Sequence, residues 1–112
     1  EKILVEAVPI DFSHTWAAIC SYDLYLKTGN KRFIKEGHHA HRKVKTWADT
    51  GMQILKAPSV LLNAIASLCN KKTSWTQIEL NFKDAITSCS DSKCLIFEAI
   101  GAERLSKYFL TT

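Results

Sequence analysis

The stretch PSVLLNAIASLCNKKTSWTQIELNFKDAITSCS, residues Pro58 to Ser90, decides the fold of this chain. In each half, apolar residues recur at spacings of three and four, which gathers them on one face of a helix. They are Leu61, Leu62, Ile65, Leu68 and Cys69 in the first half and Ile78, Phe82, Ala85, Ile86 and Cys89 in the second. The polar run at 70–74 interrupts both patterns, and Thr73 or Ser74 can cap the second helix. A short connection makes neighbouring helices antiparallel, so the stretch predicts a helical hairpin.

The segment before this hairpin predicts a first helix that starts at a cap from Asp11 or Ser13 and ends at Gly29. Its expected inward face consists of Trp16, Ile19, Cys20, Tyr22 or Asp23, and Leu26. Residues 1–10 could form an extended lead-in or the end of an upstream helix, and the pattern does not choose between them.

Asn30 then caps a second helix, expected over Lys31 to Thr50. Its apolar face consists of Phe33, Ile34, Gly37, Ala40, Val44, Trp47 and Ala48. A glycine inside a helix costs about 1 kcal/mol relative to alanine, so Gly37 predicts close packing against a partner helix. The connection at 52–57 is apolar enough to tuck against the bundle.

The turn at 90–92 leads into a fifth helix, whose expected inward face consists of Leu95, Ile96, Ala99, Ile100, Ala102, Leu105 and Phe109. No stretch favours a β-strand. The fold class predicted from these patterns is all-α, with about five antiparallel helices in a single domain over residues 1–112. Trp47 and Trp75 are expected to pack in the core, and Trp16 to face an adjacent domain.

Length and composition describe an ordinary globular domain. The chain has 112 residues, of which 46% are hydrophobic and 23% charged, and it lacks the run of about 20 apolar residues that a membrane span needs. It begins at Glu1, and we expect it to be a piece of a larger protein. Four cysteines and the absence of an Asn-x-Ser/Thr site favour reduced thiols and an intracellular, cytoplasmic location.

The positive charge is concentrated in the predicted second helix. Its basic residues are Lys31, Arg32, Lys35, Arg42, Lys43 and Lys45, against Glu36 alone. Such a run is typical of a surface for an anionic partner or of a solvated helix face. Nucleic acid is the less favoured partner, because the sequence pI of 8.9 falls short of the value above about 9 that is usual for nucleic-acid-binding domains.

The sequence has no clear catalytic or metal-binding motif. His38 and His41 share a helical face, but no cysteine ligand is close in sequence and the surrounding basic residues repel a cation, so we predict a solvated face and no metal. Cys89 and Cys94 do not have the C-x-x-C spacing of a redox or zinc motif. No nucleophile elbow, carboxylate pair or glycine-rich phosphate loop is present, so we expect no enzyme activity and no cofactor.

The hairpin also resembles a tetratricopeptide (TPR) motif. Leu62, Ile65 and Ala66 stand at the large, large and small positions of the motif's first helix, and Ile78, Phe82 and Ala85 at the small, aromatic and small positions of its second. The wider sequence is similar to the TPR-like segment that follows the AAA-type ATPase module in large eukaryotic multidomain kinase and ATPase proteins. The segments that carry this resemblance are HRKVKTWADTG (41–51), LLNAIASL (61–68), NFKDAITSC (81–89) and AIGAERLSKYFL (99–110).

The resemblance implies a fragment of a TPR-like α-α superhelix, serving as a non-catalytic protein–protein interaction module or regulatory scaffold arm of a multidomain signalling protein. Its partner would be another protein or a neighbouring domain of the same chain. In TPR arrays the first helix of each pair lines the concave side, so Asn63 and Ser67 become candidate contacts in a partner-binding groove. The alternative is a secreted four-helix-bundle ligand of cytokine type, stabilised by disulfides among the four cysteines.

Overall fold

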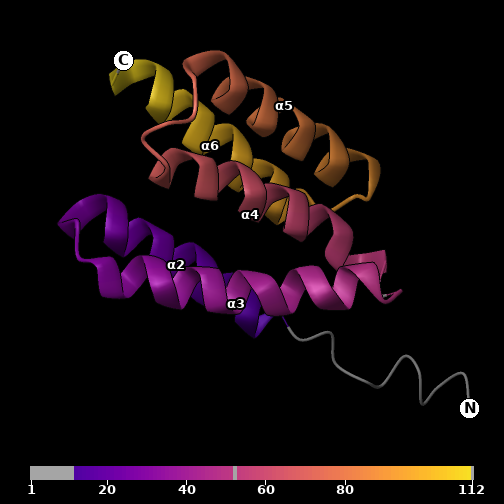
Figure 1. Cartoon of the computed structure of the whole chain (residues 1–112). Helices are drawn as coiled ribbons and strands as arrows, with labels where there is room; N and C mark the ends of the chain where they lie inside the picture. The colour runs from indigo at the N-terminus through magenta and orange to yellow at the C-terminus, as the bar shows by residue number, and fades with distance from the viewer. Residues whose placement is uncertain (1–11, 52, 112) are drawn as a thin grey trace, which may run out of the picture.

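A computed structural model describes residues 12–51 and 53–111, and over these residues the chain is all-helical without a β-strand (Figure 1). The elements are α2 (Ser13–Thr28), α3 (Lys31–Asp49), the 3-10 helix η1 (Gln53–Leu55), α4 (Lys56–Cys69), α5 (Trp75–Asp91) and α6 (Leu95–Thr111). The all-α prediction with five helices is therefore confirmed for the described part of the chain. The predicted lead-in at 1–10 lies outside the described residues.

The signals at Gly29, Asn30 and Ser74 act as the sequence predicts, whereas the predicted cap of the first helix by Ser13 is wrong, because Phe12 stands at the N-cap of α2 and no side chain caps it. Asp11, the other candidate, lies outside the described residues. Gly29 adopts the left-handed conformation with φ of 74°, and its N–H donates to the carbonyl of Tyr25 at the end of α2. The Asn30 side chain accepts from the Arg32 N–H at 2.9 Å and caps α3, and Ser74 accepts from the Gln77 N–H at 3.1 Å and caps α5. Both helical hairpins are thus fixed by their turns.

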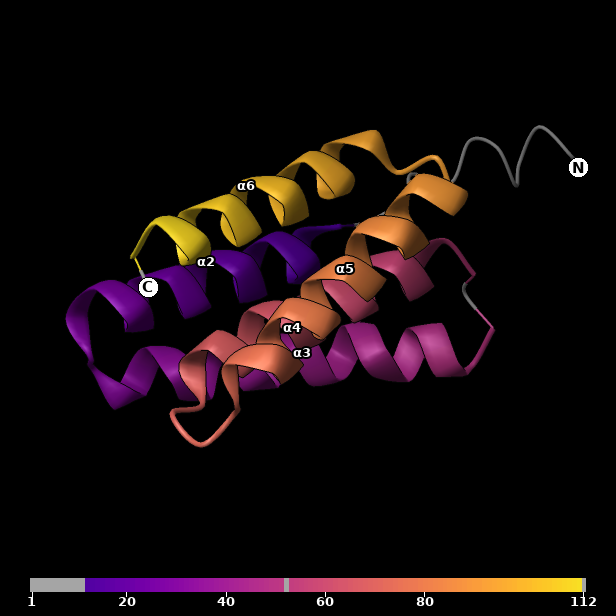
Figure 2. The same cartoon turned by 90° about the horizontal axis from the view of Figure 1, so that it is seen from above.

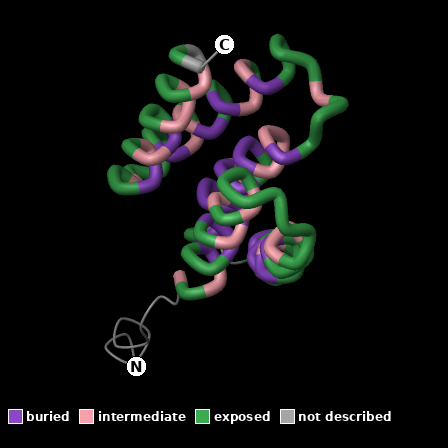
Figure 3. The backbone as a smooth tube through the Cα atoms, turned by 90° about the vertical axis from the view of Figure 1, so that its left-hand side faces the viewer, coloured by how far each residue is buried: buried purple, intermediate pink, exposed green. Residues whose placement is uncertain are grey.

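The helices stack in layers around α4. The α2–α3 hairpin forms one layer, α4 lies in the middle, and α5 and α6 cover its other side (Figures 1 and 3). Helix α4 packs against α2, α3, α5 and α6, so it is apolar around most of its circumference. Its buried residues are Ala57, Pro58, Ser59, Leu61, Leu62, Ala64, Ile65 and Cys69.

The predicted inward face of α2 is only half right. Ile19 and Tyr22 are buried as expected, but the face is completed by the small residues Thr15 and Ala18. These four positions keep the same helical spacing and let α2 approach its neighbours closely. The bulkier candidates are displaced outward: Cys20 is exposed, Trp16 is 37% exposed and Leu26 47% exposed.

The predicted inward face of α6 is wrong at its start. Leu95 and Ile96 are 73% and 60% exposed, and Ala99 and Ala102 are exposed too. Phe97 is buried instead, with its ring 5.4 Å from that of Phe12 and 5.3 Å from that of Trp16. Trp16 therefore packs partly against this chain's own α6.

Trp75 also departs from the prediction, because it is 46% exposed and meets the ring of Tyr108 at the surface rather than in the core. Trp47 is half-buried against the core cluster.

Cys69 and Cys89 are buried, and all four cysteines of the chain are free thiols. Burial raises the pKa of each of these two thiols to about 11, so both stay protonated at neutral pH. None of the described helices is both long and apolar enough to cross a membrane.

Candidate functional site

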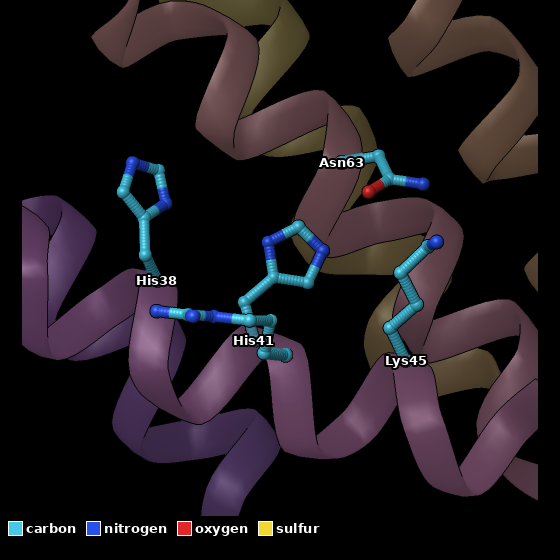
Figure 4. Close-up of a pocket in the computed structure, with 5 residues that line it drawn as sticks. His38, His41, Lys45 and Asn63 are labelled. Carbon is cyan, nitrogen blue, oxygen red and sulfur yellow. The ribbon is translucent and has the colours of Figure 1, made fainter.

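Polar and titratable side chains, among them His41 with its lowered pKa, come together between α3 and α4. A pocket of about 310 Å³ is lined there by His38, His41, Arg42, Lys45 and Asn63. Figure 4 shows His38, His41 and Lys45 extending from α3 toward α4, from which Asn63 projects. We call this space the α3–α4 pocket.

Helical periodicity explains why α3 supplies four of these side chains. Residues 38, 41, 42 and 45 follow the i, i+3, i+4, i+7 spacing, so they share one flank of the helix. The adjacent flank carries Gly37, Ala40, Val44 and Ala48, which are buried in the core. The small buried side chains bring α3 close to its neighbours and hold the polar flank at the rim of α4.

Tyr22 of α2 supports the pocket from the core side. Its side chain is fully buried, and its hydroxyl oxygen lies 2.8 Å from Nδ1 of His38 and 3.0 Å from Nδ1 of His41. Burial raises the pKa of Tyr22 well above its ordinary value, so the hydroxyl keeps its proton. With a single proton, it donates to one imidazole and accepts from the other when both bonds form.

The prediction of a solvated histidine face holds for His38, which is exposed, but not for His41, which is half-buried. Both rings lie within hydrogen-bond distance of the Tyr22 hydroxyl. His14 of α2 packs edge-on against Trp47, with ring centroids 5.2 Å apart. Within residues 12–51 and 53–111, no group of three or more His, Cys, Asp or Glu side chains is arranged to hold a metal ion.

His41 is electrostatically perturbed. Burial lowers its pKa below the ordinary value of 6.5, and the charges of His38 and Lys45 act in the same direction. A polar interaction with Asn63 opposes this in part. Nε2 of His41 is buried and makes no regular hydrogen bond among the described residues.

The His41 shift predicts how stability depends on pH. Because the folded state holds the proton less tightly than the unfolded chain, the neutral ring's contribution is complete above about pH 6.5 and declines as the pH falls below that value. Between pH 7.5 and 5.5 we expect His41→Gln to flatten the pH dependence of the free energy of unfolding, by less than about 1.4 kcal/mol per pH unit, the limit for one proton.

Urea denaturation at a series of pH values measures this slope for the parent protein and the variant. His39→Gln is the matched control, because His39 is exposed on the same helix. Equal flattening in both variants would contradict the assignment to His41.

A second pocket of about 440 Å³ continues along the same seam, and His38 and Asn63 line both spaces. Its other lining residues are Ile34, Ala66, Ser67, Cys69, Asn70 and Thr73. Asn63 and Ser67, predicted as groove contacts, therefore lie together on the side of α4 that faces α3. The Ser67 hydroxyl donates back to the carbonyl of Ala64 at 2.5 Å.

The space between α2, α4 and α6 is separate from the two pockets that Asn63 lines. A pocket of about 530 Å³ there is lined by Asp23, Leu26, Lys27, Leu68, Arg104, Lys107 and Tyr108, and it includes the ion pair between Asp23 and Arg104. Asn63 and Ser67 are absent from this lining. Asn63 and Ser67, which the TPR resemblance indicated, therefore line one pocket together. That pocket does not lie between α2, α4 and α6, where the resemblance would place a groove.

The six basic residues of α3 are all exposed but do not form one site. Arg42 and Lys45 line the α3–α4 pocket, while Lys43 lies with Arg42 in a shallower pocket beside Trp47. Lys31, Arg32 and Lys35 stand in the first turns of α3, where the guanidinium of Arg32 lies 5.0 Å from the Phe33 ring centroid. Sequence reasoning missed the pocket because Tyr22, its buried support, comes from another helix.

Comparison of this chain with protein-family models, with curated proteins and with solved structures finds no match.

Proposed function

We propose that this chain is a non-catalytic protein-interaction module, and that the α3–α4 face binds an acidic segment of its partner. The observation that carries the proposal is the α3–α4 pocket, where Arg42 and Lys45 of the basic helix meet Asn63 of the predicted groove set. Two cations of α3 and a polar residue of α4 thus line one pocket, although Asn63 lies outside the space between α2, α4 and α6 that the TPR register implied.

The distribution of charge supports an anionic partner. Lys31, Arg32 and Lys35 occupy the positive end of the α3 dipole, and the first turn holds no acidic residue. These cations therefore add to the field of the helix terminus rather than cancel it. A surface of this kind speeds association with an acidic segment and disfavours basic ones.

The order of helix packing supports a helical-repeat module of TPR-like type. Helix α4 begins the second hairpin and packs on both helices of the first, and α6 packs on both helices of the second. Such stacking builds a surface from successive helix pairs. We place the module inside the cell, in a scaffold or regulatory arm, where its buried thiols stay reduced.

The test is affinity capture of partners followed by measured affinities. We expect Arg42→Glu with Lys45→Glu to weaken binding of a captured partner roughly tenfold or more, and Asn63→Ala with Ser67→Ala to weaken it less, because the first change reverses two charges in the pocket. Lys71→Glu with Lys72→Glu is the matched control, since both lysines are exposed in the α4–α5 turn. If every partner binds all variants equally, the α3–α4 face is not the interaction surface.

A further inference from the structure

We propose that the α3–α4 pocket receives a phosphoryl group, carried by a phosphorylated serine or threonine of the partner segment. This inference rests on the proposed function and assigns the chemistry of the group at the centre of the interface. Three observations support it: hydrogen-bond donors from two helices line the pocket, the lining is positively charged, and a second pocket adjoins it.

The lining matches a dianion. Arg42 and Lys45 supply two fixed positive charges, and no carboxylate is among the lining residues. Lys45 has only a long contact of 3.9 Å with Asp49, between two exposed side chains, which contributes little. A phosphorylated side chain carries a charge of about −1.5 to −2 at neutral pH, so its charge balances the two cations.

His41 supplies a donor directed at the same space. When the Tyr22 hydroxyl donates to Nδ1 of His41 and accepts from Nδ1–H of His38, the neutral His41 ring carries its proton on Nε2. In that arrangement the Nε2–H is buried and makes no regular hydrogen bond among the described residues, although Asn63 interacts with the ring. A buried donor without a full hydrogen bond is costly. A phosphoryl oxygen in the α3–α4 pocket would accept from it.

The number of donors favours a phosphoryl group over a carboxylate. Nε2 of His41, the guanidinium of Arg42, the ammonium of Lys45 and the amide of Asn63 come from two helices. A carboxylate offers two oxygens and one negative charge, whereas a phosphoryl group offers three terminal oxygens and a second charge. The second pocket begins at His38 and Asn63 and gives room for residues that flank the phosphorylated one.

The experiment records the histidine ring nitrogens of the ¹⁵N-labelled protein by NMR during titration with three probes. The probes are a blocked tripeptide with phosphoserine at its centre, the same tripeptide with glutamate in that place, and inorganic phosphate. We expect the phosphoserine peptide to shift the Nε2 resonance of His41 and to bind at least tenfold tighter than either other probe.

Two paired variants locate the binding. Arg42→Gln with Lys45→Gln should weaken the phosphoserine peptide at least tenfold, and Lys71→Gln with Lys72→Gln should leave it unchanged, because only the first pair lines the pocket. Circular dichroism of each variant checks that the helices are retained.

Each other outcome overturns a stated part of the proposal. Equal binding of the glutamate peptide would overturn the phosphoryl assignment while leaving an acidic partner in place. Equal binding of inorganic phosphate would overturn the peptide source. An unchanged His41 resonance at millimolar phosphoserine peptide would overturn the site. The proposed interaction function fails by a different result, namely that captured partners bind the α3–α4 variants as tightly as the parent protein.

Discussion

Replacing Tyr22 with alanine is expected to lower the free energy of unfolding by about 3–5 kcal/mol, the range for removing a large aromatic side chain from a packed core. Tyr22 is fully buried between α2 and α3, and its ring meets the rings of His38 and His41 with centroids 5.4 Å and 6.0 Å away. The variant loses this packing and leaves a cavity beneath the α3–α4 pocket. Urea denaturation followed by circular dichroism measures the loss.

Tyr22→Phe separates the ring from its hydroxyl. The ring packing is kept, but Nδ1 of His38 and Nδ1 of His41 lose their shared partner, for which we expect a loss of about 1–3 kcal/mol. The NMR spectrum of the His41 ring should change as well, because its tautomer is no longer selected by the phenol. Equal stability of Tyr22→Phe and the parent protein would show that the hydroxyl contacts contribute nothing net.

Gly37→Ala is the second large effect. A β-carbon at position 37 would lie 2.8 Å from both Cδ1 and Cε1 of Tyr22, closer than side chains tolerate. The ring cannot withdraw, since it is buried and bonded at its far end. Overpacking of this kind costs about 1–3 kcal/mol, against a gain of about 1 kcal/mol in helix propensity, so we expect a net loss of up to about 2 kcal/mol in the free energy of unfolding.

Gly101→Ala is the matched control for the glycine. Gly101 is also buried inside a helix, but its added β-carbon would lie 3.2 Å from Cγ1 of Ile86 and 3.5 Å from Cδ1 of Leu61, both in aliphatic side chains. A small adjustment of Ile86 relieves this contact, so the change in the free energy of unfolding should be close to zero or favourable. A larger loss at Gly101 than at Gly37 in parallel denaturation curves would refute the assigned role of Tyr22.

Much of the fold is predictable because it is specified locally. The caps at Asn30 and Ser74 and the stop at Gly29 act within a few residues of themselves. The sequence alone identifies Asn30 and Gly29 and offers Ser74 as one of two candidate caps. Gly37 is predictable too: a costly glycine inside a helix indicated close packing, and the Tyr22 ring is what it accommodates. The inward face of α4 follows from its dense apolar pattern.

The faces of α2 and α6 were less predictable because each helix offers two stripes with helical spacing. In α2 the stripe that contains Trp16 and Leu26 competes with one that contains Thr15 and Ala18, and close approach selects the smaller residues. In α6 the burial of Phe97 rather than Leu95 depends on two aromatic partners, Phe12 before α2 and Trp16 within it. Hydrophobicity alone does not show which of the two stripes on a helix is buried.

The candidate site was predictable only in part, because its residues are far apart in the sequence. Arg42, Lys45 and Asn63 were selected from charge and from a family resemblance, but nothing local joins them. The bonds from Tyr22 to His38 and His41 span 16 and 19 residues and exist only after α2 and α3 have paired. Periodicity places residues on faces, whereas the partner across the interface is decided by tertiary packing.

The central position of α4 has a consequence for how this chain comes apart. Viewed from above, α5 lies over α4 and α4 over α3 (Figure 2). Because α4 begins one hairpin and packs on both helices of the other, its detachment uncovers apolar residues in both layers. Partial unfolding that frees α4 therefore exposes core residues of both layers at once, and intermediates that retain half the bundle are disfavoured. We therefore expect residues 12–51 and 53–111 to unfold as one cooperative unit, in which a destabilising change in α4 weakens the packing of both layers.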